Sequence, residues 1–535
     1  MSEDVRVARH AGVVGAATLA SRVLGLVREL VMASLFGAGL ATDAFNVAFR
    51  IPNLLRDLFA EGAMSSAFVP TFTEHRKSGG DEAGWALGRQ LLITLFAVLS
   101  VVVIVGWWIT PALVPVMAPG FATIPGKVGL TVLLTRVMLP FLPAVAMAAA
   151  VMGMLNARGR FGVPALAPAL LNVGMIVGAL ALLPVCRAWG QPPILAMALG
   201  VLIGGIGQFV FQLPALHAEG FRLRLEPPRF PPGVIRIGLL MLPATFGLAA
   251  TQLNLFVSTL IASLLVEGSV SWLWYAFRLM QLPIGVFGVA LATVSLPALA
   301  RAAVDQDKPA MAVTLSAAVR LVFALTIPAS VWLAVLSGPL VALLYEHGAF
   351  TADDTVQTAR ALIMYSLGLP AFAALGVLTR AFYALGDTAP AVRATFGAVA
   401  VNLGLNLLFI GPLRPLGLEH LGLALSTSAT AVANLLQLAI YLRRRIGPME
   451  GARMLRTAAR VMLVSVLAVA PSAIGLALLK GAERGRWPAE LAVVAVSLAL
   501  TGALGLVLAR VFGVEELPAL KELVGSVLGR LNRSR

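Results

Sequence analysis

The chain has 535 residues, of which 59% are apolar and only 12% are charged. Soluble globular proteins are about 45–50% apolar and about 25% charged, so the composition excludes a soluble protein and also the disordered, fibrous and nucleic-acid-binding classes. Together with a mean hydropathy of +0.91, it predicts an all-α polytopic membrane protein. The net charge of +15 then reflects Lys and Arg kept on the cytoplasmic side, with no nucleic-acid partner.

Fourteen apolar stretches are long enough to cross a bilayer. They cover residues 11–36, 43–73, 84–110, 129–155, 162–184, 194–216, 234–265, 272–300, 311–336, 358–383, 391–411, 420–442, 459–479 and 488–512. One set of alternate loops holds 17 Lys and Arg and the other holds 6, three of which lie at 480–487. The richer set is expected to be cytoplasmic, and so are both termini.

The two halves of the chain resemble each other at an offset of about 228–230 residues. Phe49-Arg50 matches Phe277-Arg278, and Asn172 matches Asn402. Because each half holds six spans, both enter the membrane from the same face, as in transporters built from parallel repeats. We therefore expect two six-helix lobes related by a pseudo-two-fold axis. The expected parts are an N-terminal lobe (1–216), a cytoplasmic linker (217–233), a C-terminal lobe (234–445), and two extra helices with a cytoplasmic tail (446–535).

The first two spans carry an unusual number of charged residues. These are Arg22, Arg28, Glu29, Asp43, Arg50, Arg56, Asp57 and Glu61, and Arg278 stands in the eighth span. Since one charge at the bilayer centre costs about 2.5–3.5 kcal/mol on insertion scales, several charges together indicate a water-filled cavity. The excess of arginine suits a phosphate or pyrophosphate, which guanidinium groups bind in bidentate fashion. The alternative is that each arginine reaches an interface or pairs with a neighbouring acid.

The second half carries small polar residues in place of charges. Asn402 and Asn406 are one helical turn apart on one face, with Thr427 on the next span. Their oxygens could serve as ligands for a monovalent cation. The alternative is ordinary hydrogen bonding between helices. The single Cys186 and five scattered histidines offer no metal-ligand or catalytic spacing, so we expect no catalytic residues, no metal and no cofactor.

Several segments resemble those of the MurJ/MviN lipid II flippase family, within the multidrug/oligosaccharidyl-lipid/polysaccharide exporter superfamily. They are Ser21-Arg-Val-Leu-Gly-Leu-Val-Arg28, Phe36-Gly-Ala-Gly-Leu-Ala-Thr-Asp43-Ala-Phe, Pro52-Asn-Leu-Leu-Arg56, Phe59-Ala-Glu61-Gly-Ala, Ala67-Phe-Val-Pro70, Gly268-Ser-Val-Ser-Trp272 and Tyr383-Ala-Leu-Gly-Asp387. The resemblance implies fourteen helices around a V-shaped cationic cavity. It also implies transfer of an undecaprenyl-pyrophosphate-linked peptidoglycan precursor, lipid II, to the outer leaflet of the bacterial plasma membrane by alternating access.

The resemblance also implies roles for single residues. Arg22, Arg28 and Arg278 match cavity arginines that meet the pyrophosphate, and Arg56 matches another required basic position. Asp43 and Glu61 match acids implicated in gating, and we group Glu29 with these functional acids. The two helices outside the repeat match those that line a groove for the lipid tail.

Two positions depart from the family pattern. Phe277 stands where an acid often precedes the arginine of the eighth span. A cation site of the family type would take Ser258, Asn402, Asn406 and Thr427, but Ser258 and Asn406 replace carboxylates. Coupling to the membrane potential and coupling to a monovalent cation therefore both stay open.

Three other functions compete with that of a lipid II flippase. A flippase for another polyprenyl-linked oligosaccharide would use the same basic cavity, whereas a drug/cation antiporter of the same superfamily would need an acidic one. An enzyme acting on polyprenyl phosphates needs a His or carboxylate cluster, and no His lies among the cavity charges. The expected partners are lipid II and membrane lipids. We expect a functional monomer that could work with the cell-wall synthesis machinery.

Overall fold

The computed structural model describes residues 3–59, 63–224, 226–387, 389–478 and 487–518. Within these ranges every regular element is a helix, which confirms the predicted all-α class. Contacts divide the chain into unit 1, residues 1–271 with 348–350, and unit 2, residues 272–347 with 351–535. These units follow packing, whereas the predicted lobes follow sequence repetition, so the lobes at 1–216 and 234–445 stay a proposal.

Unit 1 contains the first nine α-helices. They are α1 (Glu3–Phe36), α2 (Leu40–Phe59), α3 (Ala63–Met117), α4 (Lys127–Met138), α5 (Phe141–Ala157), α6 (Gly162–Leu166), α7 (Ala169–Ala188), α8 (Leu195–Ala218) and α9 (Pro232–Ser263), with a 3-10 turn at Pro119–Thr123. One core cluster joins α2, α4, α5, α7 and α8, and another joins α3, α5 and α9. Because lipid tails are as apolar as these side chains, the two clusters hold unit 1 together by close van der Waals packing.

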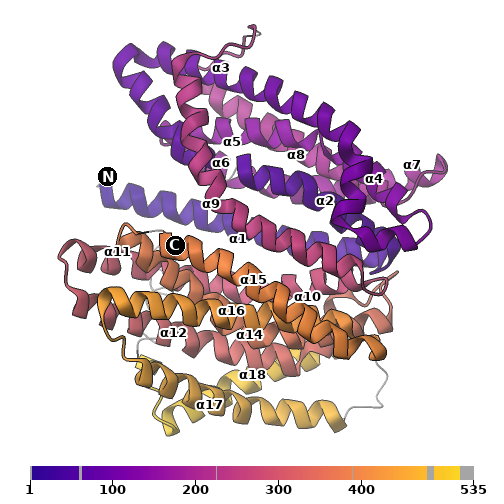
Figure 1. Ribbon diagram of the computed structural model, residues 1–535, viewed down its shortest axis with the longest axis vertical. Helices are drawn as coiled ribbons and strands as arrows, with labels where there is room; N and C mark the ends of the chain where they lie inside the picture. Colours follow the sequence, from indigo (N-terminus) through magenta and orange to yellow (C-terminus); the bar gives the residue numbers. More distant parts are fainter. Residues whose placement is uncertain (1–2, 60–62, 225, 388, 479–486, 519–535) are drawn as a thin grey trace. The chain divides into compact units, whose positions relative to one another are not determined.

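The remaining helices lie in unit 2, except that α10 begins in unit 1. They are α10 (Ser269–Pro283), a π-helical turn at Ile284–Gly288, α11 (Val289–Val304), α12 (Lys308–Val335), α13 (Ser337–Tyr345), α14 (Ala352–Ala384), α15 (Ala389–Leu413), α16 (Glu419–Ile446), α17 (Gly451–Leu478) and α18 (Trp487–Val511), with a 3-10 turn at Arg414–Leu416. Figure 1 shows α14 and α16 side by side, and they pack against each other along their length.

Ten of the described helices are long and apolar enough to cross a membrane. The four predicted spans outside this set are 11–36, 43–73, 234–265 and 272–300, the first two spans of each predicted lobe. They too are helical where the structure describes them. The first two of these spans carry most of the charged residues that the sequence analysis assigns to a cavity. The membrane class is therefore secure, and the count of fourteen spans stays a prediction.

The predicted cytoplasmic loop at 74–82 is a sharp turn inside α3. The rings of Phe72 and Trp85 are 5.5 Å apart at their centroids, although thirteen residues of straight helix would separate them by about 20 Å. The chain reverses at Gly80, whose φ of 78° is the left-handed conformation that glycine adopts without strain. Within the predicted span 43–73, the structure describes helix up to Phe59 and again from Ala63, and residues 60–62 lie outside the described ranges.

Helices α7 and α8 approach each other through glycine. A Cβ atom at Gly174 would lie 2.4 Å from the Gly204 backbone, and one at Gly178 would lie 2.5 Å from the Gly200 backbone. Each helix therefore presents two glycines four residues apart, the spacing that lets membrane helices pack backbone to backbone. Helices α15 and α16 of unit 2, which correspond to α7 and α8 at the offset of the proposed repeat, also pack together.

We expect Gly204→Ala to lower the free energy of unfolding of the purified protein by about 1–3 kcal/mol and hence its melting temperature, because the added methyl group meets the Leu171 backbone at 2.8 Å. Gly207→Ala on the same helix is the control, since a Cβ there meets nothing within 4 Å. Equal melting temperatures for both variants in detergent would contradict this account of the α7–α8 contact.

The predicted topology can be tested at Ser78, which is exposed beside the Gly80 turn, and at Ala352, which is exposed at the start of α14. In a Cys186→Ala background, Ser78→Cys should be protected in intact cells from an impermeant thiol reagent, whereas Ala352→Cys should react. Permeabilised cells give the control for intrinsic reactivity. Labelling of both positions in intact cells would overturn the predicted orientation.

Candidate functional site

Arg28 and Glu29 form a buried pair on α1. Their residues are 8% and 2% exposed, and the Arg28 guanidinium contacts the Glu29 carboxylate directly. Arg28 Nη1 also donates to Asn172 Oδ1 on α7 at 3.1 Å, while Asn172 Nδ2 donates to the Ser21 carbonyl at 3.1 Å. Arg28 is therefore held in place by α7. Its pairing with the neighbouring Glu29 is the alternative to a free cavity arginine that the sequence analysis left open.

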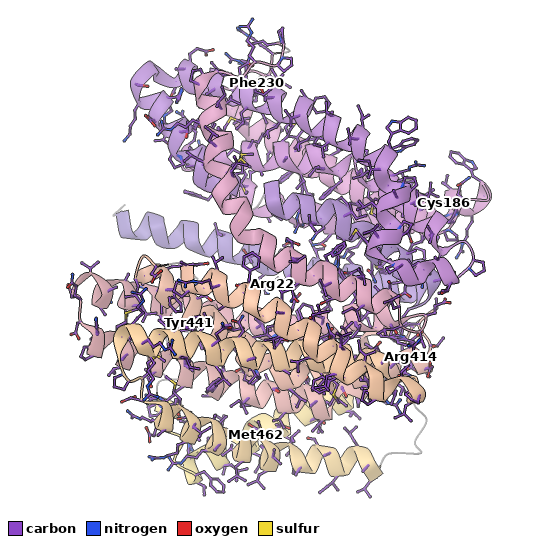
Figure 2. All side chains as sticks on the ribbon, viewed as in Figure 1. Arg22, Cys186, Phe230, Arg414, Tyr441 and Met462 are labelled. Carbon is purple, nitrogen blue, oxygen red and sulfur yellow. The ribbon has the colours of Figure 1, made fainter. Side chains whose placement is uncertain are left out.

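Arg22 lies on the same helix with an exposed side chain (Figure 2). The sequence places Arg22 and Glu29 on one face, but they differ in exposure: Glu29 is 2% exposed, whereas the Arg22 side chain is exposed. An exposed guanidinium keeps its donors available for an anionic group. Arg22 therefore has the geometry of a ligand-binding arginine, while Arg28 has that of an anchored one.

Asp43 lies at the centre of a second buried group, which we call the Asp43 cluster and define as Asp43, Lys127, Gly268 and Ser271. Asp43 is 1% exposed near the start of α2, and Lys127, also 1% exposed, is the first residue of α4. Lys127 Nζ donates to Asp43 Oδ2 at 2.9 Å. The same carboxylate accepts from the backbone amides of Gly268 and Ser271 at 2.9 Å and from the Ser271 hydroxyl at 2.6 Å.

The other charged residues of α2 have different surroundings. Arg50 Nη1 donates to the Leu255 carbonyl at 2.9 Å and contacts the Thr259 hydroxyl, so it fastens α2 to α9. Arg56 is half-buried near the end of α2. Glu61 lies outside the described residues, and of Asp57 the structure describes the backbone alone. The role of Glu61 as a gating acid therefore stays a prediction.

Arg278 lies half-buried on α10 in unit 2. Its guanidinium lies over the Trp274 ring, 4.6 Å from the centroid, and Nη1 donates to Gln281 Oε1 at 3.2 Å. The preceding Phe277 packs on the rings of Tyr365 and Phe372 at 5.3 Å and 6.4 Å between centroids. The position where the family often has an acid is thus part of an aromatic cluster in this chain.

The small polar residues of unit 2 make hydrogen bonds both within and between helices, and one of them is the interhelical kind considered as the alternative to a cation site. Asn402 Nδ2 donates to Thr430 Oγ1 on α16 at 3.2 Å, and Asn406 Nδ2 donates to Asn402 Oδ1 at 3.0 Å. Thr427 donates to the carbonyl of Leu423 in its own helix. Ser258 lies half-buried on α9, in unit 1. The two asparagines therefore come together as predicted, with Thr430 as a partner that the sequence did not single out.

Sequence reasoning also missed Lys127, the most deeply buried cation among these groups. A signal for it was present, since Lys127 is the one basic residue in the predicted outer loop 110–128 and Asp43 begins a span that is predicted to start at the same membrane face. Within the described residues, no three His, Cys, Asp or Glu side chains gather closely enough to hold a metal ion. Arg28 and Glu29 form an ion pair, as do Lys127 and Asp43, and each pair has further hydrogen-bond partners.

A further ion-pair group joins the predicted cytoplasmic loops of unit 1. Arg158 donates to Glu219 and Asp81 at 3.1 Å and 3.0 Å, and Arg160 donates to Glu219 at 2.6 Å. Hydrogen bonds from Arg160 and then Arg158 lower the pKa of the Glu219 carboxyl. Together with Arg76 they line a polar pocket of about 310 Å³. Because Arg158 bridges residues from α3 and α8, the group fixes these loops to one another.

The arrangement of helices is that of a known class of membrane transporters. A solved inward-facing multidrug resistance MATE family transporter of the MOP superfamily superposes with a TM-score of 0.65, covering 81% of this chain and 96% of that one at 14% identity. At that identity the likeness concerns the fold alone. The fold therefore defines a multi-pass helical membrane protein.

The family is narrower than the fold. The model of the family described as lipid II flippase MurJ matches residues 32–485. The lipid II flippase MurJ of Burkholderia cenocepacia is 40% identical over 80% of this chain and 82% of its own length, and the probable lipid II flippase MurJ of Vibrio cholerae is 39% identical over 79% and 80%. A solved lipid II flippase MurJ in an inward closed conformation has a TM-score of 0.75 at 26% identity, covering 93% of this chain and 98% of that one. The chain belongs to the MurJ family, and it is a multi-pass bacterial inner membrane protein.

The two arginines of α1 should differ in what they contribute to stability. Arg28→Ala leaves Glu29 as a buried charge without its guanidinium and should cost about 3–5 kcal/mol. Arg22→Ala removes an exposed side chain and should leave the melting temperature unchanged. The double variant Arg28→Ala/Glu29→Gln should recover part of the loss. If Arg22→Ala and Arg28→Ala melt at the same temperature, the pairing of Arg28 is not stabilising.

Proposed function

We propose that this protein is a lipid II flippase, which moves the undecaprenyl-pyrophosphate-linked peptidoglycan precursor from the inner to the outer leaflet without catalysing a reaction. Membership in the MurJ family is the observation that carries the proposal. The chemistry of the arginines agrees with it, because a pyrophosphate is a polyanion whose oxygens suit guanidinium donors. An antiporter for cationic drugs would need the opposite charge, and α1 carries an excess of arginine over acid.

We propose different roles for the three cavity arginines. Arg22 binds phosphate oxygens directly, because its side chain is exposed. Arg278 supplies a guanidinium whose plane is fixed over Trp274, which reduces the entropy lost when it binds an anion. Arg28 adds positive potential from a fixed position and orders α1 through Asn172. Arg56 serves as an additional basic group on α2.

We further propose that transport proceeds by alternating access, with both termini in the cytoplasm and the protein acting as a monomer. Asp43 and Glu61 would serve opposite gates, since they are eighteen residues apart in the sequence, which corresponds to about 27 Å along an unkinked helix. No covalent step is needed, because the substrate leaves unchanged. The membrane potential is the simplest energy source for an anionic headgroup, being worth about 2.3 kcal/mol per charge at 100 mV.

Cation coupling through Asn402 and Asn406 is a weaker part of the proposal. The side-chain oxygen of Asn402 already accepts a hydrogen bond from Asn406 at 3.0 Å. A cation would therefore have to displace this bond, and neither asparagine brings the negative charge that binds a monovalent ion well in a dry interior. We accordingly place the membrane potential first and cation coupling second.

The proposed function is testable with the purified protein in liposomes that contain fluorescent lipid II on one leaflet. We expect Arg22→Ala and Arg278→Ala each to slow transport by about 10- to 100-fold, because a charge-assisted hydrogen bond is worth about 1.5–3 kcal/mol. Arg→Lys at either position should retain part of the rate. Arg187→Ala, at an exposed arginine near the end of α7, is the matched control.

The same variants should be tested for restoring growth and outer-leaflet lipid II in cells depleted of their own flippase. Wild-type rates in both Arg22→Ala and Arg278→Ala would remove headgroup binding from the proposal. Transport of another polyprenyl-linked oligosaccharide with no transport of lipid II would reassign the substrate.

A further inference from the structure

The Asp43 carboxylate is saturated with hydrogen-bond donors. Oδ2 accepts from Lys127 Nζ and the Gly268 amide, both at 2.9 Å. Oδ1 accepts from the Ser271 amide at 2.9 Å and the Ser271 hydroxyl at 2.6 Å. Three of these four donors belong to the residues that begin α10, and the fourth is the only one that carries a full charge. Asp43 thus caps α10 while its charge is balanced from α4.

Lys127 is buried as completely as the carboxylate it contacts. It is 1% exposed, and its ammonium lies 4.3 Å from the centroid of the Phe121 ring, itself 1% exposed. The ring covers the ammonium, which limits access of water to the pair. Two opposite charges that water cannot reach depend strongly on each other, because the loss of either leaves an uncompensated charge in a low dielectric.

We infer that Lys127 is a positioning residue for Asp43. The contact that Asp43 makes with Gly268 and Ser271, at the face predicted to be outer, is called the outer seal below. By holding Oδ2, Lys127 keeps the carboxylate in the rotamer that places Oδ1 on Ser271, and by balancing the charge it makes the sealed state stable without water. Without Lys127, the unpaired carboxylate is more stable in water than buried, so its hydration favours separation of the start of α10 from Asp43. This role rests on the proposed alternating-access function, in which the start of α10 leaves Asp43 once per cycle.

Ser269 provides a reporter for this seal. It lies between Gly268 and Ser271, is fully buried, and its hydroxyl has no hydrogen-bond partner in the structure, so Ser269→Cys is a mild substitution. In a Cys186→Ala background, an impermeant thiol reagent should label Ser269→Cys slowly in intact cells. The rate of labelling then measures how often the start of α10 separates, independently of any lipid substrate.

We expect Lys127→Met to raise the labelling rate of Ser269→Cys by about tenfold or more, and Lys127→Arg to keep it within a few-fold of the parent. Thr131→Val is the matched control: Thr131 lies one turn further along α4, is equally buried, and its hydroxyl donates to the Lys127 carbonyl. This control should leave the labelling rate unchanged. A Lys127→Met rate equal to that of the parent would overturn the inference.

Combined variants distinguish a Lys127 that positions Asp43 from a Lys127 that only stabilises the packing of α4. If Lys127 acts through Asp43, then Lys127→Met should have little further effect in an Asp43→Asn background, because the charge it balances is gone. If the two substitutions multiply their effects, Lys127 acts elsewhere and the inference is wrong. Should Lys127→Met fail to reach the membrane, Lys127→Gln carries the same test, since it lacks the charge but keeps a donor.

The labelling result can be told apart from a failure of the proposed function. Lipid II transport is measured in parallel for the Cys186→Ala parent and for each variant. A seal that responds to Lys127 in a protein that does not move lipid II would reassign the substrate and leave the positioning role intact. A protein that moves lipid II but whose seal ignores Lys127 would refute the positioning role alone.

Discussion

The placement of charge in a medium that cannot solvate it is the constraint on which this structure depends. Glu29 is buried against Arg28, and Asp43 is buried against Lys127. Arg28 also donates a hydrogen bond to Asn172 on α7, and Asp43 accepts hydrogen bonds from the start of α10. The Arg28–Glu29 pair lies within α1 but is tied to α7 through Asn172, whereas the Asp43–Lys127 pair joins α2 to α4. These charges therefore oblige α1 to meet α7, and α2 to meet α4 and the start of α10, at fixed points. The apolar contacts then fill the space between those points.

In unit 1, close approach of helix backbones also specifies which helices pack together. Where no charge specifies a contact, as between α7 and α8, glycine removes the side chains and lets backbones touch. The apolar surfaces themselves provide little preference for one partner, since lipid is as apolar as leucine. Charge pairs and glycine seams therefore carry the specificity, and the many alanine, leucine and valine residues supply volume.

Much of the fold could be predicted from the sequence because composition and span length report directly on the membrane. The predicted stretches fall in helices, and Asn402 and Asn406 meet as their spacing requires. The contacts of Lys127 could not be predicted in the same way, because no periodicity within one helix indicates which cation of a distant loop meets Asp43. The difference between Arg22 and Arg28 was equally hidden, since it depends on Asn172, more than 140 residues away.

The turn at Gly80 has a consequence for how the chain can move. A flexible loop between two spans would let each slide and rotate on its own, whereas here the reversal takes place essentially at one residue, with Phe72 and Trp85 in contact across it. The two arms of α3 therefore form a helical hairpin whose only hinge is the φ and ψ of Gly80. A displacement of the first arm is consequently transmitted to the second as a rotation about this hinge, because no flexible loop lies between them to absorb it.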